Sequence, residues 1–429
     1  PDGELSPKNI IKLQQYIKTK GSSTNVAVYV GQNGIRKEVM GMEPVLSNPK
    51  QISSMKTLVK EGMELGAVGF STGLMYEPGM YSNTEEVIEL AKVAASFGGS
   101  YDSHVRNPVH QLIDSYKEAI EIGRQANLPV KLAHVKLVGF KNRDLFPQVE
   151  KLINDARNEG LSVVSDQYPY DGAANDWLWK IIALPKEMMP EKETELTRDW
   201  VVALLSDGDK SAKLKQFNEN GKDNFSWVKA VGYGSMRVVV AEAQPELVGK
   251  HISELADELG KNGFDVIADM ITNPKLNINI TLGSVLEENV RNFLRKPWNM
   301  VSSDGVWTDT AGALISHPRS TGSFPRILGR YVRQEGLLDL SEEIYKMSAF
   351  PADFLGLGKR GYIRKGYIAD IAIFDPEKIS DRSDWVHPER MSIGMNHVII
   401  NGKLAMENGE ITQQLTGQFV KHNRIRSEK

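Results

Sequence analysis

Short β-branched runs alternate with longer amphipathic runs along the first part of the chain. The short runs predict strands, and the longer runs, with apolar residues three or four positions apart, predict helices. The candidate strands cover residues 25–30, 67–71, 100–104, 130–134, 162–166 and 299–303. Since helical segments separate most successive strands, the order predicts a parallel sheet with crossover helices.

A helix is expected to begin at Thr84, with Glu85 and Glu86 in its first turn and glycines at 98 and 99 after its end. Acidic residues are favourable near a helix N-terminus, and glycine commonly follows the last turn. Two further helices are expected over residues 109–126 and 146–160.

Several predicted strands end on residues that can perform chemistry, namely His104, His134, Asp166 and Asp304. This is typical of a (β/α)₈ barrel, whose active site lies at the C-terminal ends of its strands. A doubly wound sheet shows the same alternation, but its phosphate-binding glycine loop is missing here. The pattern therefore favours an α/β barrel, with six of its eight strands visible.

The alternation of strands and helices stops after residue 176. A stretch rich in Lys, Glu and Asn predicts an insertion around residues 176–230 over the barrel mouth. A helix is expected over residues 241–260. The tail turns to β character at 367–374 and 397–402. We therefore expect a catalytic barrel over residues 1–360 and part of a small β-sandwich over 361–429.

Composition excludes several classes of protein. The 429 residues are 41% hydrophobic and 25% charged, with a formal net charge of −3, which gives no basis for a nucleic-acid partner. No apolar run approaches the roughly 20 residues that span a bilayer. Cysteine is absent, so this sequence offers neither disulfides nor zinc thiolates, and nothing in it indicates a compartment.

Two histidines and one aspartate stand out as candidate chemistry. His104 and His134 close strands that are about one strand–helix–strand step apart, so their imidazoles could converge on zinc. Asp304 could exchange protons with a water molecule. Arg319 could bind a substrate carboxylate through its planar fork. Each also has a plainer interpretation: hydrogen-bonded or surface histidines, a capping aspartate and a surface arginine.

Taken together, the motifs resemble the D-aminoacylase branch of the amidohydrolase superfamily. The matching stretches, in order, are GAVGFSTGLMYEPG (66–79), YDSHVRN (101–107), LPVKLAHVK (128–136), SDQYPYDG (165–172), SSDG (302–305), HPRSTGSFPRILGRYVR (317–333) and GYIADIAIFDP (366–376). The resemblance runs from about residue 25 to the C-terminus, and the combined set is specific although no single motif is.

The resemblance implies metal-dependent hydrolysis of N-acyl-D-amino acids to a carboxylic acid and a D-amino acid, with one or two zinc ions. It implies His104, His134 and Asp304 as metal ligands, with Asp304 also the catalytic proton carrier. Tyr168, Arg319 and Lys136 are the expected substrate-binding residues, the first two on the α-carboxylate.

The chain also departs from the family pattern. Ala174 stands where the family has a serine that assists the tyrosine, and Arg106 is followed by Asn107 and Pro108 in place of an acidic pair. The family's first strands, its His-x-His pair and its cysteine ligand have no counterpart here. We therefore expect a further N-terminal segment, or a separate chain, to complete the barrel.

Two alternatives remain open at this point. A relative that hydrolyses a cyclic amide such as a hydantoin would not need Arg319 to bind a free carboxylate. Outside the enzymes, the chain could be a metal-free scaffold or a binding subunit, since half of the expected ligands are missing.

Overall fold

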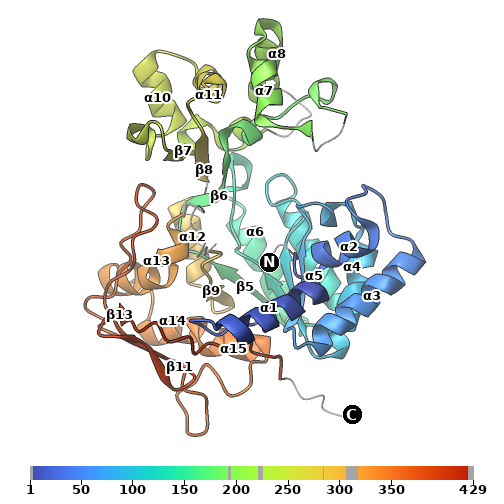
Figure 1. Cartoon of the computed structure of the whole chain (residues 1–429), viewed down its shortest axis with the longest axis vertical. Helices are drawn as coiled ribbons and strands as arrows, with labels where there is room; N and C mark the ends of the chain where they lie inside the picture. The colour runs from blue at the N-terminus through green and yellow to red at the C-terminus, as the bar shows by residue number, and fades with distance from the viewer. Residues whose placement is uncertain (1–2, 192–194, 221–225, 284, 306–316, 424–429) are drawn as a thin grey trace.

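A six-stranded parallel sheet forms the centre of the molecule, in a computed structural model that describes residues 3–191, 195–220, 226–283, 285–305 and 317–423 (Figure 1). Its strand order is β1-β2-β3-β4-β5-β9. The strands are β1 (Val30–Gly31), β2 (Gly69–Gly73), β3 (Ser100–His104), β4 (Val130–Leu132), β5 (Val163–Gln167) and β9 (Asn299–Val301). Five of the six predicted strands are thus confirmed, with ends that differ by at most two residues, whereas the strand predicted over residues 25–30 overlaps β1 only at Val30.

Helices connect the successive strands of this sheet, as expected for parallel pairing. They are α2 (Gln32–Met40), α3 (Pro49–Glu64), α4 (Thr84–Ser96), α5 (Leu112–Ala126) and α6 (Phe146–Asn158), preceded by α1 (Pro7–Lys20). The helix predicted from Thr84 begins there because the Asn83 side chain accepts a hydrogen bond from the Glu86 amide.

Successive side chains along each strand point to opposite faces of the sheet, so one face packs in the hydrophobic core and the other carries polar residues. In β3, Tyr101 is fully buried and its ring lies 6.2 Å from that of Phe70 in β2, in a core that helices α3 to α6 share. Asp102 and His104 alternate with Tyr101, so they lie on the opposite face of the sheet. The hydrophobic pattern therefore fixes which side of the sheet carries the polar residues.

A second sheet interrupts the parallel one between β5 and β9. Strands β6 (Gly172–Trp177), β7 (Met236–Ala241) and β8 (Ile278–Gly283) pair antiparallel in the order β6-β8-β7. Their helices are α7 (Arg198–Leu205), α8 (Gly208–Asn220), α9 (Trp227–Val231), α10 (Ile252–Leu259) and α11 (Gly263–Thr272). A second hydrophobic core lies mainly in this unit and extends to Val301 in β9, and the unit rises above the parallel sheet in Figure 1.

The helix expected over residues 241–260 is present only in its second half, as α10. Residues up to Ala241 belong to β7, and a short 3₁₀ turn, Pro245–Leu247, follows. Pro245 lacks a backbone donor, and Gly249 has φ of 92°, outside the helical region, so the helix cannot extend back through them.

The C-terminal part packs helices beside the sheet and then turns to β structure. Its helices are α12 (Glu287–Leu294), α13 (Arg319–Arg326), the π-helical η8 (Ile327–Gln334), α14 (Leu340–Met347) and α15 (Ala349–Leu355). A four-stranded antiparallel sheet follows, formed by β10 (Ile371–Phe374), β11 (Met395–Ile400), β12 (Lys403–Glu407) and β13 (Glu410–Ile411). The two predicted tail strands are therefore confirmed as parts of this sheet.

The tail then returns to the beginning of the chain. The Val26 amide donates to the Gln418 carbonyl at 2.9 Å, and the Val420 amide donates to Val26 at 2.8 Å. In the described ranges, no helix combines the length and the apolar character that crossing a membrane requires.

Candidate functional site

His104 and His134 meet at the carboxyl edge of the parallel sheet. His104 is the last residue of β3, and His134 follows the end of β4 by two residues. Their ring centroids lie 4.6 Å apart at an interplanar angle of 77°, and both side chains are buried. The structure therefore brings together the two histidines that the sequence singled out.

Both imidazoles are held in the neutral form. Burial lowers the pKa of His104 and of His134 well below the ordinary histidine value, and the positive charges of Lys136 and Arg319 lower both further. Zinc binds the neutral ring through a free nitrogen lone pair. The electrostatics of this edge thus favour the protonation state of a metal ligand.

An aspartate holds the backbone of His134 in an unusual conformation. His134 has φ of 38°, a left-handed value that few non-glycine residues adopt. Its amide donates to Asp166 Oδ1 at 2.5 Å, and Asp166 is also paired with Lys131. Lys131 Nζ in turn lies 3.2 Å from Asp102 Oδ1. This buried group of two carboxylates and one ammonium fixes the point at which His134 leaves the sheet.

Lys136 contacts the site on its other side. Its Nζ lies 2.8 Å from His134 Nδ1 and 5.5 Å from the centre of the Tyr168 ring. A neutral imidazole has one acceptor nitrogen, so a metal on His134 and an ammonium on the same ring exclude each other. Metal binding would therefore release Lys136 from His134.

Tyr168, Arg319 and Asp304 form the second part of the site. The Arg319 guanidinium lies 4.6 Å from the centre of the Tyr168 ring, and its Nη1 lies 2.7 Å from Asp304 Oδ2. Burial, together with the Asp304 carboxylate and against the lowering effect of Arg319, raises the pKa of Tyr168 to about 12, so the phenol stays protonated at neutral pH. A continuous chain of contacts thus joins His104 to Asp304.

The described residues supply part of a metal site. The two neutral imidazoles suit zinc as nitrogen ligands. Within the described ranges, no group of three or more His, Asp and Glu side chains lies close enough together to hold an ion. Asp304 instead contacts Arg319, so its predicted role as a ligand stays a prediction, as do the other predicted site roles.

Two residues at this edge were not singled out from the sequence as site residues. The Tyr76 ring, on the loop after β2, lies 4.7 Å from the His104 ring. His317 lies beside Tyr168, with ring centroids 5.6 Å apart. Both residues lie within stretches that resemble the family, 66–79 and 317–333. That resemblance is the only feature of the sequence that could have indicated them.

The structure describes the segment in which Asn107 and Pro108 follow Arg106 in place of the family's acidic pair. Arg106 forms an ion pair with Glu118, with Nη2 to Oε1 at 2.8 Å, and also donates to the Met80 carbonyl at 3.2 Å. Arg106 therefore joins helix α5 to the 3₁₀ turn Gly79–Tyr81. The side chain of Ala174 lies outside the described residues.

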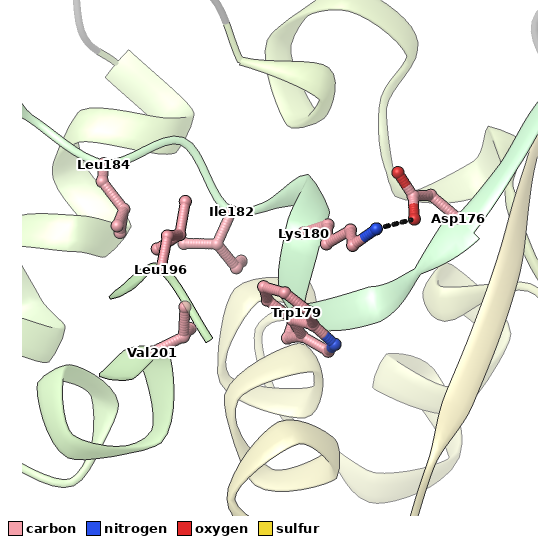
Figure 2. Close-up of a pocket in the computed structure, with 7 residues that line it drawn as sticks. All are labelled: Asp176, Trp179, Lys180, Ile182, Leu184, Leu196 and Val201. Carbon is pink, nitrogen blue, oxygen red and sulfur yellow. Dashed lines mark ion pairs between the residues drawn. The ribbon is translucent and has the colours of Figure 1, made fainter. Parts of the chain in front are cut away.

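A separate pocket of about 380 Å³ lies in the antiparallel unit (Figure 2). Ile182, Leu184 and Val201 make its wall largely apolar, and Lys180 Nζ lies 3.6 Å from Asp176 Oδ1 at its rim. It shares no lining residue with the chain of contacts between His104 and Asp304. We therefore place the chemistry at the sheet edge.

Comparison with known proteins assigns the chain to a family. Residues 186–406 match the amidohydrolase family, and the chain belongs to that family. It is 29% identical over 409 residues to a D-aminoacylase from Alcaligenes xylosoxydans xylosoxydans, covering 94% of this chain and 72% of that protein. It is 30% identical over 378 residues to an N-acyl-D-glutamate deacylase from the same organism, covering 88% and 66%.

Solved structures agree with this assignment. A crystal structure of D-aminoacylase superposes with a TM-score of 0.73 at 26% identity, covering 96% of this chain and 75% of that one. A further D-aminoacylase structure, described as having a binuclear metal centre, gives a TM-score of 0.72. The amidohydrolase-type α/β fold predicted from the sequence is thereby confirmed.

Proposed function

We propose that this edge of the sheet hydrolyses the amide bond of N-acyl-D-amino acids with the help of bound zinc, releasing a carboxylic acid and a D-amino acid. One observation carries the proposal: the Arg319 guanidinium, packed on Tyr168, lies on the same chain of contacts as two neutral imidazoles. A carboxylate-binding group beside a metal-binding pair suits a substrate that has both a free carboxylate and an amide. The relatives named as D-aminoacylase and N-acyl-D-glutamate deacylase support this choice.

His104 and His134 would hold the zinc, with Asp304 as a further ligand. Bound zinc supplies Lewis acidity at the amide carbonyl and makes a water molecule more acidic. Asp304 accepts the proton of the attacking water on its carboxylate and returns it to the departing nitrogen.

Tyr168 and Arg319 bind the α-carboxylate of the amino acid. The guanidinium can donate two parallel hydrogen bonds to it. The Tyr168 hydroxyl donates to the Ala173 carbonyl at 3.0 Å, and it can donate a third bond to the carboxylate once it leaves that carbonyl. Fixing the carboxylate sets the distance to the scissile carbonyl, which favours one geometry of attack. Lys136, once released from His134, is a further positive charge for the substrate.

We also propose that a further polypeptide segment, on the same product or as a separate chain, supplies the remaining metal ligands. Support comes from the two-imidazole set among the described residues and from the strands β1 and β9, which end the sheet as edges. We further propose two domains: a catalytic domain over residues 1–360, with an insertion around 176–230, and a small β domain over 361–429.

A substrate panel tests the reaction class. The zinc-loaded protein should release free amino acid from N-acetyl-D-amino acids and should leave five-membered cyclic amides intact. A cyclic amide of the hydantoin type carries no free carboxylate and gives Arg319 nothing to bind. Turnover of the cyclic compounds alone would refute the proposal.

A further inference from the structure

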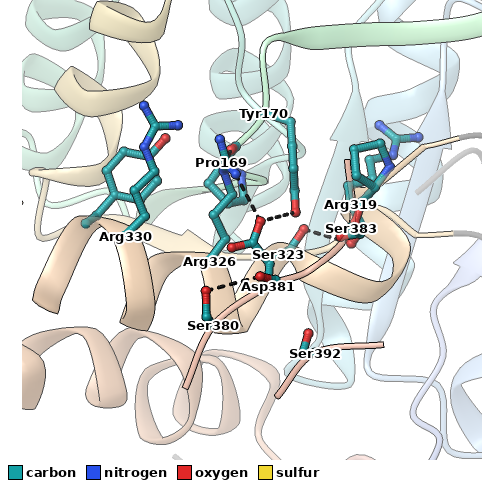
Figure 3. Close-up of polar contacts among 12 residues, drawn as sticks. Pro169, Tyr170, Arg319, Ser323, Arg326, Arg330, Ser380, Asp381, Ser383 and Ser392 are labelled. Carbon is teal, nitrogen blue, oxygen red and sulfur yellow. Dashed lines mark hydrogen bonds and ion pairs between the residues drawn. The ribbon is translucent and has the colours of Figure 1, made fainter. Parts of the chain in front are cut away.

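A segment of the C-terminal part crosses the start of α13 (Figure 3). We call residues 380–392, which lie between β10 and β11, the strap. Ser383 Oγ donates to the Pro318 carbonyl at 3.1 Å, and Thr321 Oγ1 donates to the Pro388 carbonyl at 2.8 Å. The strap is therefore hydrogen-bonded to the turn that begins the helix of Arg319.

Asp381 ties the strap to two elements at once. Its Oδ2 accepts from Arg326 Nη1 in α13 at 2.9 Å and from the Tyr170 hydroxyl at 3.3 Å, as Figure 3 shows. Arg326 also donates from Nε to the Pro169 carbonyl at 3.0 Å. Asp381 thus joins α13 to the segment that follows β5, which carries Tyr168.

Trp385 extends these contacts to the carboxylate-binding pair. Its ring centroid lies 4.5 Å from that of His317, and its Nε1 donates to Asp171 Oδ1 at 3.1 Å. The His317 ring in turn packs edge-on against Tyr168. His317 Nδ1 accepts from the Arg319 backbone amide at 3.2 Å. Trp385 therefore supports Tyr168 and Arg319 through one intermediate residue.

His317 uses both of its ring nitrogens in this arrangement. Nε2 lies 3.3 Å from the Gly172 carbonyl and donates to it, while Nδ1 is the acceptor for Arg319. Burial and the nearby Arg319 charge lower the pKa of His317 well below its usual value, which keeps one nitrogen an acceptor. The ring therefore links the segment after β5 to the first residue of α13.

Glycines allow the strap to approach this closely. A methyl group on Gly172 would stand 2.2 Å from Trp385 Cη2. One on Gly322 would stand 2.2 Å from the Tyr170 hydroxyl oxygen and 2.4 Å from Ser383 Oγ. Both separations are far below van der Waals contact, so the strap is packed without spare room.

We propose that Trp385 and His317 are positioning residues, through which the strap sets the geometry of Tyr168 and Arg319 and thereby the preference for a free α-carboxylate. The inference rests on the proposed function. A small displacement of a substrate-binding group can lower turnover on the order of 100-fold, so support behind Arg319 has a measurable consequence.

The test compares two substrates, N-acetyl-D-methionine and its methyl ester, on three variants. Trp385→Leu removes the ring behind His317, and Trp385→Phe restores a ring without the Nε1 donor. His317→Phe fills the same space but removes the acceptor for the Arg319 amide. The matched control is Trp200→Leu, a tryptophan of the antiparallel unit whose Nε1 donates to the Met188 carbonyl at 2.9 Å.

We expect the ratio of kcat/KM for the free acid to that for the ester to fall on the order of tenfold in Trp385→Leu and in His317→Phe, mainly through KM of the acid. Trp385→Phe should recover most of the ratio, and Trp200→Leu should keep it. Equal losses on both substrates, or a wild-type ratio in both Trp385→Leu and His317→Phe, would overturn the inference.

The same experiment separates this inference from the proposed function. A wild-type protein that hydrolyses neither substrate overturns the proposed function, and the inference with it. A wild-type protein that prefers the acid, together with variants that keep this preference, overturns the inference alone. His317→Phe keeps the test decisive if Trp385→Leu does not fold, since it retains an aromatic ring at this position.

Discussion

Arg319 and Asp304 form an ion pair, with Nη1 2.7 Å from Oδ2. The proposed carboxylate-binding group is therefore in contact with the proposed proton carrier. A substrate carboxylate that enters the guanidinium fork competes with Asp304 for it, because both are anions that seek the same donors. We expect substrate binding to release the Asp304 carboxylate toward the attacking water, which couples recognition of the substrate to proton transfer.

Replacing Arg319 with lysine should lower kcat/KM for N-acyl-D-amino acids on the order of 10-fold to 100-fold. A compact ammonium cannot reproduce the planar fork, although it preserves the charge. Esters and amides of the same substrates should be poor for the wild type and little affected by Arg319→Lys. Steady-state kinetics on matched acid and ester pairs measure the effect, and equal losses on both would show that Arg319 has a structural role.

Asp304→Asn should abolish turnover while leaving the fold and most substrate binding intact. Asparagine keeps the shape of the side chain and tolerates the left-handed backbone, φ of 45°, that residue 304 adopts. An amide cannot accept the proton, and such roles usually contribute about 10²–10⁴-fold. Single-turnover rates, with circular dichroism as the folding control, test this. A variant that retains more than about a tenth of the wild-type rate contradicts the assignment.

His104→Ala and His134→Ala should each lower the zinc content of the purified protein. Each substitution removes one of the two imidazoles, whose ring centroids lie 4.6 Å apart. His387→Ala is the matched control, since the His387 side chain lies on the strap and is 45% exposed. Metal analysis by mass spectrometry gives the stoichiometry. Unchanged zinc content in both site variants would show that these histidines are not ligands.

Lys131→Met should lower the free energy of unfolding by about 3–5 kcal/mol. The change leaves Asp102 and Asp166 buried together without their shared cation. Lys117→Met is the control, because its ion pair with Asp114 is exposed and should contribute no more than about 1 kcal/mol. Urea denaturation measures both, and a loss in Lys131→Met no larger than in the control would contradict this role for the buried group.

The parallel sheet was predictable because its strands are short and alternate with amphipathic helical segments and turns. The strand predicted over residues 100–104 coincides with β3. The antiparallel sheet was not predictable from the sequence, for two physical reasons. β6 reads Gly-Ala-Ala-Asn-Asp-Trp, which has low β propensity, and it becomes a strand by pairing with the distant β8.

The candidate site divides in the same way. His104, His134 and Asp304 end predicted strands, so topology alone brought them to one edge. The contact between Trp385 and His317 depends on how the C-terminal part packs against α13, which local patterns do not encode. The sequence predicted Arg319 as a carboxylate-binding residue and Asp304 as a proton carrier, but it did not predict their ion pair, which likewise depends on tertiary packing.

The most direct test of the proposed function is chiral analysis of the amino acid released from a racemic N-acetyl amino acid by the zinc-loaded protein. The proposed site fixes both the α-carboxylate and the scissile amide, so the two enantiomers must direct their side chains differently, and we expect only one of these directions to fit. We predict that the free D-amino acid accumulates while the N-acetyl-L-amino acid remains. Release of both enantiomers at equal rates, or of the L-amino acid alone, would contradict the proposed function.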